Sequence, residues 1–98
     1  MKLKTTPFDA AEYLETDEDI RVFLQAAIDE GPPEYFPRAL ATAARAKGMT
    51  EIAKQAGVSR SSLYKSLAEG ANPRFETISR VCAALGLRLT VIPERATA

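Results

Sequence analysis

Residues 50–67, TEIAKQAGVSRSSLYKSL, decide the expected fold because they carry the pattern of a helix-turn-helix. Thr50 is placed to cap a short helix, and the spacing of the apolar residues turns one face inward: Ile52, Ala53 and Ala56. Gly57 follows this helix, where left-handed backbone carries no side-chain penalty and the chain can change direction. The first half of the stretch therefore predicts a helix that ends at a sharp corner.

The second half of the stretch predicts a helix that can read DNA. Val58 fills the corner, Ser59 is placed to cap the new helix, and Leu63 and Leu67 face its interior. The side chains left outside are mostly short, polar or basic, as a helix needs to enter a DNA major groove. They are Ser59, Arg60, Ser61, Tyr64 and Lys65.

We expect eight residues to contact double-stranded DNA, five of them on this helix surface. Arg60 lies near the helix start, where its guanidinium can fork onto guanine, and it would carry sequence preference together with Ser61. Tyr64 and Lys65 lie one turn further on and point toward a phosphate or a thymine methyl group. Contacts to the phosphate backbone are also expected from Thr50, Lys54 and Arg74.

Several of these side chains also have a purely structural explanation. Arg60 and Lys65 can serve as solubilising surface charges, and Tyr64 can pack back onto the domain with only its hydroxyl in water. Ser59 can act as a helix cap alone. The spacing of the whole stretch favours DNA binding over these separate explanations.

Hydrophobic spacing predicts two helices near the start of the chain and a third just before the stretch quoted above. The first covers residues 10–14, and the second follows a cap at Asp17. Its inward residues are Ile20, Phe23, Leu24, Ala27 and Ile28. Residues 31–33, Gly-Pro-Pro, end it, and the third helix covers residues 34–46.

A last helix and a strand are predicted after the helix-turn-helix. The helix covers residues 75–85 and is expected to bury Phe75, Ile78, Cys82 and Leu85. Residues 87–92 alternate weakly and are β-branched toward their end, which predicts a short C-terminal β-strand stopped by Pro93. An unpaired strand at the end of a chain is a ready site for pairing with another chain.

The charges of the chain are divided between its halves, although the net charge is zero. Residues 1–47 hold nine acidic and six basic residues, whereas residues 48–98 hold four acidic and seven basic ones. From Asp9 to Glu34 nine carboxylates accompany Arg21 alone. This asymmetry predicts two surfaces with different partners, although a solvated acidic helix face explains any single carboxylate equally well.

Composition excludes several functional classes. Histidine is absent and Cys82 is the single cysteine, which removes disulfide frameworks, most zinc sites and every histidine-dependent triad. We expect no enzyme activity, no metal and no cofactor. The sequence has no apolar run of the ~20 residues that cross a bilayer and no basic-then-apolar leader, so we expect a cytoplasmic protein without a membrane partner.

DNA binding of this kind predicts a homodimer. One such domain reads only about four to six base pairs, and specific affinities of ~10⁻⁸ M or tighter generally require two half-sites. The two reading helices would then lie about 34 Å apart along the duplex. The C-terminal strand and the last helix are the expected interface.

The chain resembles the addiction-module antidote proteins, antitoxins of the HigA-like type within the Cro/repressor helix-turn-helix superfamily. The resemblance is carried by LATAARAKGMTEIAKQAGVSRSSLYKSLAEGANPRFETI and by DAAEYLETDEDIRVFLQAAIDEG. It implies an all-α, lambda-repressor-like helix-turn-helix bundle with an N-terminal helical extension. It divides the chain into an acidic extension, residues 1–33, and a DNA-binding domain with its C-terminal strand, residues 34–98.

The resemblance also implies a function and a second partner. Such a protein binds and neutralises a RelE/ParE-like toxin and, as a dimer, represses the promoter of the operon that they share. Toxins that bind RNA are typically basic, so the acidic extension is the expected toxin-binding surface. Its candidate residues are Phe8, Tyr13, Asp17, Glu18 and Phe23. Two alternatives stay open, namely a stand-alone phage-type transcriptional repressor and an interaction adaptor that does not bind DNA.

Overall fold

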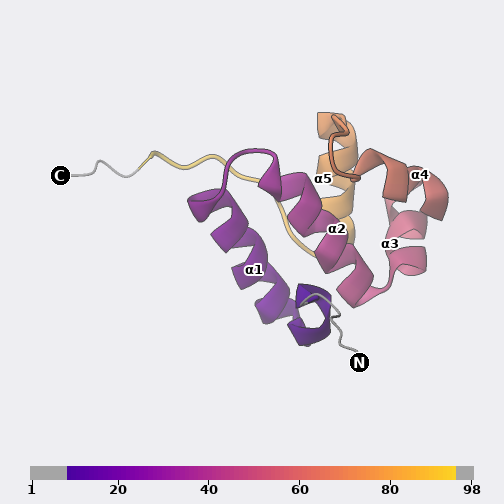
Figure 1. Cartoon of the computed structure of the whole chain (residues 1–98), viewed down its shortest axis with the longest axis horizontal. Helices are drawn as coiled ribbons and strands as arrows, with labels where there is room; N and C mark the ends of the chain where they lie inside the picture. Colours follow the sequence, from indigo (N-terminus) through magenta and orange to yellow (C-terminus); the bar gives the residue numbers. More distant parts are fainter. Residues whose placement is uncertain (1–8, 95–98) are drawn as a thin grey trace, which may run out of the picture.

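The helices of this chain are short and most are joined by tight turns, whereas residues 67–74 form a longer connection before the last helix (Figure 1). The computed structural model describes residues 9–94, and the elements of this part are helical throughout. They are the 3₁₀ turn η1 (Ala10–Tyr13) and the helices α1 (Asp17–Glu30), α2 (Tyr35–Lys47), α3 (Met49–Ala56), α4 (Arg60–Ser66) and α5 (Phe75–Ala84). The all-α expectation is confirmed. No helix in this part of the chain has the length and apolar character needed to cross a membrane.

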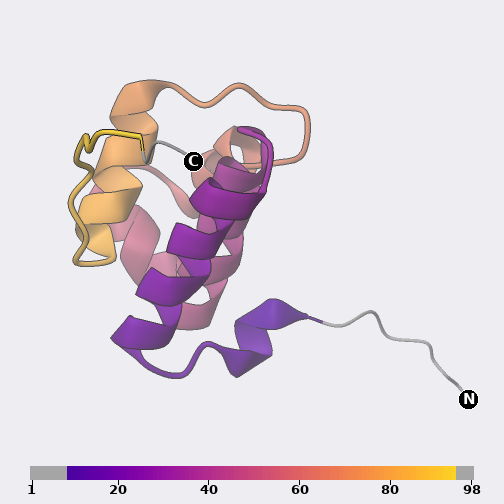
Figure 2. The ribbon, with the colours of Figure 1, turned by 90° about the vertical axis from the view of Figure 1, so that its left-hand side faces the viewer.

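Helix α2 lies at the centre of the arrangement. It contacts η1, α1, α3 and α5, and α3 packs against both α4 and α5. Figure 1 shows α1 on one side of α2 and the pair α3–α4 on the other, and Figure 2 shows the same ribbon turned by a quarter. The acidic helix and the predicted DNA-reading helix are therefore held on opposite sides of the molecule.

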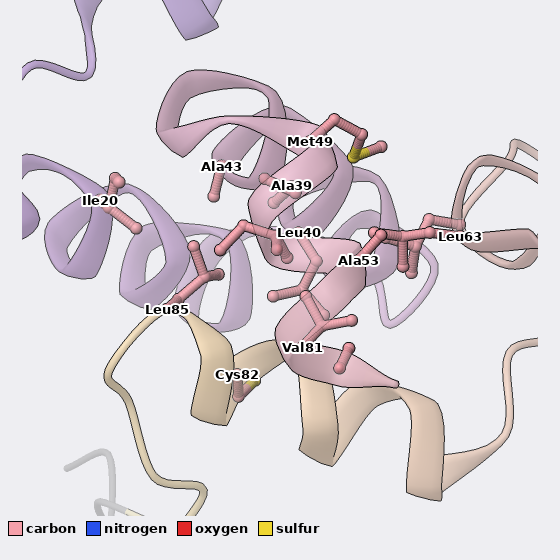
Figure 3. Close-up of a cluster of buried hydrophobic side chains, with 14 of the residues drawn as sticks. Ile20, Ala39, Leu40, Ala43, Met49, Ala53, Leu63, Val81, Cys82 and Leu85 are labelled. Atoms are coloured by element: carbon pink, nitrogen blue, oxygen red, sulfur yellow. The ribbon is translucent and has the colours of Figure 1, made fainter. Parts of the chain in front are cut away.

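The core is built around the inward face of α2, where small and large apolar side chains alternate (Figure 3). Ala39, Ala43 and Ala44 let neighbouring helices approach closely, and Leu40 fills the space between them without any exposure to solvent. Dense packing of this kind makes each buried methyl group contribute to stability. The side chains that have almost no exposure are Leu40, Ile52, Leu63, Leu67 and Val81.

Helix α1 shares this core. Ile20 and Leu24 belong to the same buried cluster as residues of α2, α3, α4 and α5. Phe23 and Ala27 are partly buried and pack against that cluster. The division of the chain at residue 33 stays a prediction, and α1 is attached to the rest by apolar packing.

A capping box starts α1. The Oγ1 atom of Thr16 accepts a hydrogen bond from the N–H of Asp19 at 3.0 Å. The carboxylate of Asp19 accepts bonds from the N–H groups of Glu15, at 3.0 Å, and Thr16, at 3.1 Å. Thr16 is thus the cap, and the prediction that Asp17 would cap this helix is wrong, because Asp17 is already its first helical residue.

Three further predictions about the helices are corrected. Thr50 does not cap α3, because the helix begins at Met49 and Gly48 precedes it without a side-chain cap. Ile28 and Phe75 are predicted to lie in the core, but their solvent-exposed fractions are 54% and 74%. Both line an apolar groove beside the α1–α2 turn that no described residue fills.

The predicted C-terminal strand is absent from the described residues. Gly86, at φ +79°, turns the chain back at the end of α5, and the N–H of Leu87 bonds to the carbonyl of Cys82 at 2.9 Å. Leu87 and Leu89 pack against the core while Arg88 and Thr90 are exposed, so the expected alternation is present over this part. Residues 88–92 have no neighbouring strand among the described residues, and a strand needs a partner for its backbone groups.

Removing the Asp19 carboxylate should make stability less dependent on pH. The N–H groups of Glu15 and then Thr16 lower the pKa of Asp19 below its ordinary value. Its contribution is therefore complete above the unfolded pKa of about 3.9 and is lost as pH falls through the lower pKa of the folded state. Asp19→Ala should have a lower melting temperature than the wild type at pH 7, and the difference should shrink below pH 4.

Circular dichroism melting curves between pH 7 and pH 3 measure this effect. Glu15→Ala removes the same charge from an exposed carboxylate that is in no ion pair within residues 9–94 and should leave the melting temperature nearly unchanged. A difference between Asp19→Ala and the wild type that stays constant over the whole pH range would contradict the role given to the carboxylate.

Candidate functional site

A glycine corner fixes the angle between α3 and α4. Gly57 has φ +79°, the left-handed region that favours glycine. Its N–H bonds to the carbonyl of Lys54 at 3.2 Å, and the N–H of Val58 bonds to the carbonyl of Ala53 at 3.0 Å. These two bonds form a Schellman motif, which satisfies the last carbonyls of α3 and stops the helix. The corner predicted at Gly57 is confirmed.

The start of α4 also agrees with the sequence. The Oγ atom of Ser59 accepts a hydrogen bond from the N–H of Ser62 at 3.0 Å, so Ser59 is the cap that the pattern indicated. Leu63 and Leu67 are buried against the rest of the domain. The helix is only seven residues long, and this inward anchoring leaves its opposite side in solvent.

Each of the eight residues predicted to contact DNA is exposed. Two come from α3, five from the cap and body of α4, and one from the residue that precedes α5. They are Thr50 and Lys54, then Ser59, Arg60, Ser61, Tyr64 and Lys65, then Arg74. The structure therefore makes all of them available to a partner, and none is needed to fill the core.

Arg60 and Tyr64 form a pair on the outside of α4. The guanidinium carbon of Arg60 lies 5.6 Å from the centre of the Tyr64 ring, within the range of a cation–π contact. The two residues are four apart on one helix, which places their side chains on the same face. The ring thus limits where the guanidinium can point and holds it at the helix surface.

Most of the described basic residues that have no ion pair lie on or near α3 and α4. Four cations have carboxylate partners: Arg21 with Glu18, Arg45 with Asp9, Lys47 with Asp17, and Arg80 with Glu76. The cations that have no such partner within residues 9–94 are Arg38, Lys54, Arg60, Lys65, Arg74 and Arg88. Four of these six belong to the predicted DNA-binding set. Their positive charge is left for an external anion.

The residues predicted to bind a toxin occupy several environments. Phe8 lies outside the described residues, and Tyr13 is exposed at the end of η1. Asp17 pairs with Lys47, and Glu18 pairs with Arg21 at 2.7 Å, a contact that lowers the pKa of Glu18. Phe23 is partly buried and lines a groove between α1 and α2.

Sequence reasoning missed this groove between α1 and α2. Its walls come from the second half of α1 and the first half of α2, with Gly31 at the turn between them. The lining residues are Phe23, Ala26, Ala27, Glu30, Gly31, Tyr35, Arg38, Ala39 and Thr42. The available signal is the Gly-Pro-Pro turn at residues 31–33, which not only ends a helix but also brings the two helices side by side.

Cys82 is buried in the core, and burial raises the pKa of its thiol. Both features are typical of an inert packing residue. Within the described part of the chain, no group of three or more histidine, cysteine or acidic residues is arranged to hold a metal ion.

The fold and its charged surfaces define an all-α protein with a basic helix pair and an acidic helix on opposite sides. Residues 4–93 match a family described as "Probable addiction module antidote protein", and the chain belongs to this family. Membership indicates the role of an antidote whose partner is a toxin. The similarity to addiction-module antidotes predicted from the sequence is thereby confirmed.

A relative from Haemophilus influenzae (strain ATCC 51907 / DSM 11121 / KW20 / Rd) carries the description "Uncharacterized protein". It is 41% identical over 88 residues, which cover 90% of this chain and 91% of the relative. No solved structure gives a significant match to the chain.

Changing the glycine corner should cost stability through the backbone alone. A Cβ atom at Gly57 would meet only the Arg80 guanidinium, at 3.7 Å, so the side chain has room. Gly57→Ala must still adopt the left-handed backbone, which costs about 1–2 kcal/mol for an L-residue. Gly57→Asn should lose less, because asparagine tolerates this conformation better.

Chemical denaturation of the three proteins measures this difference. Equal losses for alanine and asparagine would show that crowding, and not the positive φ, dominates at the corner.

Proposed function

We propose that this protein is an antitoxin of a type II toxin-antitoxin module, of the HigA-like type. It neutralises a RelE/ParE-like toxin in the cytoplasm and, as a homodimer, represses its own operon by binding operator DNA. Helices α3 and α4 act as a Cro/repressor-type helix-turn-helix. Family membership supports the antidote role. The observation that carries the DNA-binding part is the group of unpaired cations on α3, α4 and the start of α5.

In this proposal α4 enters the major groove by its exposed side. Ser59 and Ser61 are short enough to let the helix approach the base edges, and Arg60 reaches a guanine from its position over Tyr64. Lys65 contacts a phosphate further along the helix. Thr50 and Lys54 on α3, and Arg74 before α5, hold the phosphate backbone and set the orientation of the domain.

The homodimer uses the C-terminal segment and α5. Residues 88–92 are extended and make no backbone hydrogen bond within the described structure, so their N–H and C=O groups are free to pair with a second strand. Val91 and Ile92 keep 95% and 72% of their exposure, and Phe75 lies exposed at the start of α5. Covering this apolar surface stabilises a dimer.

The toxin binds the acidic side of the molecule. The described carboxylates between Asp9 and Glu34 lie on η1, α1 and the segments that flank them, across α2 from the helix pair that faces DNA (Figure 1). The predicted contact residues Tyr13, Asp17, Glu18 and Phe23 all belong to this side. Deleting the extension is a poor test, because Ile20 and Leu24 belong to the core. Surface substitutions are required instead.

Arg60→Ala should weaken binding to operator DNA by about 1–3 kcal/mol more than it weakens binding to a random duplex. Affinity for either duplex should fall steeply with added salt, since phosphate-bound counterions are released. Fluorescence anisotropy with the DNA upstream of the operon measures both effects.

Arg21→Ala is the matched control, because it removes the same charge from α1, far from α4. If Arg60→Ala loses the same affinity for operator and random DNA, Arg60 contacts only phosphate groups. A flat salt profile of the wild-type protein would favour an adaptor that does not bind DNA.

Proline substitutions in the C-terminal segment should separate backbone pairing from simple apolar contact. Successive N–H groups of a strand point to opposite edges, so only one of Thr90→Pro and Val91→Pro should remove a bond to the partner strand. We expect one variant to raise the dimer dissociation constant at least tenfold and the other to change it little.

Sedimentation equilibrium gives both dissociation constants. Val91→Thr controls for the lost apolar side chain while it keeps the N–H group. If both proline variants have the same dissociation constant as the wild type, the dimer does not form by pairing of these strands.

A further inference from the structure

We propose that the toxin docks on the second half of α1, in the groove between α1 and α2, and that this partner is a basic protein that inserts apolar side chains there. This inference rests on the proposed antitoxin function and narrows the acidic surface to one site. We call this site the α1–α2 groove and define it by Phe23, Ala26, Glu30, Tyr35 and Arg38.

Four of the six carboxylates on η1 and around the start of α1 are already engaged within the molecule, and the other two, Glu12 and Glu15, have no ion pair among residues 9–94. Asp17 pairs with Lys47, Glu18 pairs with Arg21, and Asp19 accepts two backbone bonds as part of the capping box. Asp9 likewise pairs with Arg45 at 3.1 Å. A cation from a partner would have to replace these contacts, and such an exchange yields little net attraction.

The carboxylates at the end of α1 are in a different state. Glu30 is the last residue of α1 and Glu34 directly precedes α2, and neither has an ion pair within residues 9–94. Asp29 directly precedes Glu30 on α1. Its carboxylate accepts one hydrogen bond from the neutral side-chain amide of Gln25 at 3.2 Å. This end of the helix therefore carries negative charge that pairs with no cation among residues 9–94.

An apolar groove lies directly beside these unpaired carboxylates. Phe23, Ala26 and Ala27 form one wall, Ala39 belongs to the other, and Glu30 lies at the rim. The groove holds about 580 Å³, within the ~300–1,000 Å³ typical of sites that take up a ligand or several side chains. An apolar floor with charge at its edge is the usual composition of a protein interface centre and rim.

The Tyr35 ring lies against Gly31 and lines this groove. A Cβ atom added at Gly31 would lie 2.2 Å from Cδ2 of the Tyr35 ring, so the ring occupies space that only glycine leaves open. The ring is nevertheless half-exposed. A fixed, partly exposed tyrosine beside the unpaired Arg38 provides the two residue types that are most enriched, with tryptophan, among energetically dominant contacts.

The charge of the rim argues for a basic partner over a second copy of this chain. The α1–α2 turn carries Asp29, Glu30 and Glu34 with Arg38 as the single nearby cation among the described residues, so in a twofold contact Arg38 of one copy could pair with only one of the three carboxylates of the other, and the remaining carboxylates would repel. Helix α1, which supplies one wall of the groove, lies across α2 from α4 (Figure 1). A toxin bound there leaves the DNA-reading helix uncovered.

Two matched charge variants test the position of the site. Glu30→Lys/Glu34→Lys changes the charge beside the groove, and Glu12→Lys/Glu15→Lys makes the same change near the start of α1, where the carboxylates are also exposed and without ion pairs. The probe is the purified product of the open reading frame next to the gene for this chain. We expect its dissociation constant to rise at least tenfold for the first variant and less than threefold for the second.

Two tryptophan variants test the groove itself. Ala26→Trp fills the groove, whereas Gln25→Trp places the same ring on the neighbouring position of α1, outside the groove. Only Ala26→Trp should abolish binding of the probe by titration calorimetry. Circular dichroism and binding to operator DNA, which should be unchanged in all four variants, show that the fold is kept.

The possible failures are distinguishable. If the wild-type chain does not bind the probe, the proposed antitoxin function itself fails. If the wild type binds but the two charge variants lose equal affinity, or Ala26→Trp binds normally, the toxin lies elsewhere and only this inference is overturned. If Ala26→Trp changes the oligomeric state of the free protein, the groove belongs to a contact between copies, and the inference is likewise overturned.

Discussion

The close packing around α2 is the constraint on which the rest of the structure depends. This helix presents Ala39, Leu40, Ala43 and Ala44 inward, and it contacts η1, α1, α3 and α5. Three of these four side chains are methyl groups, so the neighbouring backbones approach closely and larger side chains from the partners fill the remaining space. A larger residue at any of the three would push a neighbouring helix outward and change the placement of both charged surfaces at once.

Internal ion pairing then determines where free charge remains. Lys47 and Arg45, at the end of α2, pair with Asp17 and Asp9, so part of the negative charge where η1 and α1 meet α2 is neutralised within the molecule. Among residues 9–94, positive charge without an ion pair is left on α3 and α4, and negative charge without one is left at Glu12 and Glu15 and around the α1–α2 turn. Counting charges along the sequence shows only that the first half is acidic and the second half basic. Ion pairing across the fold decides which charged residues of each half remain available to a partner.

Much of the fold was predictable because its signals are local. The corner at Gly57, the cap at Ser59 and the inward residues Leu63 and Leu67 follow from residue type and short spacing alone. Other features depend on what lies opposite in space. Ile28 and Phe75 have core-like spacing, yet no described element covers them, and the strand-like residues 87–92 lack a second strand.

The candidate sites show the same limit. Exposure of the eight predicted DNA-contacting residues follows from the helical period around Leu63 and the cap at Ser59. The α1–α2 groove was not predictable in this way, because it requires the Tyr35 ring to lie over Gly31 and the two helices to run side by side. The engagement of Asp17 by Lys47, thirty residues away, is equally invisible to local spacing.

The attachment of the C-terminal segment has an entropic consequence. Leu87 and Leu89 already fix the first half of this segment against the core, and the turn at Gly86 sets its direction. Ordering a free chain costs about 1–2 kcal/mol of backbone entropy per residue. A strand that is partly immobilised before association has lost much of this freedom during folding, so joining it to another chain requires less further ordering than capture of an unattached tail.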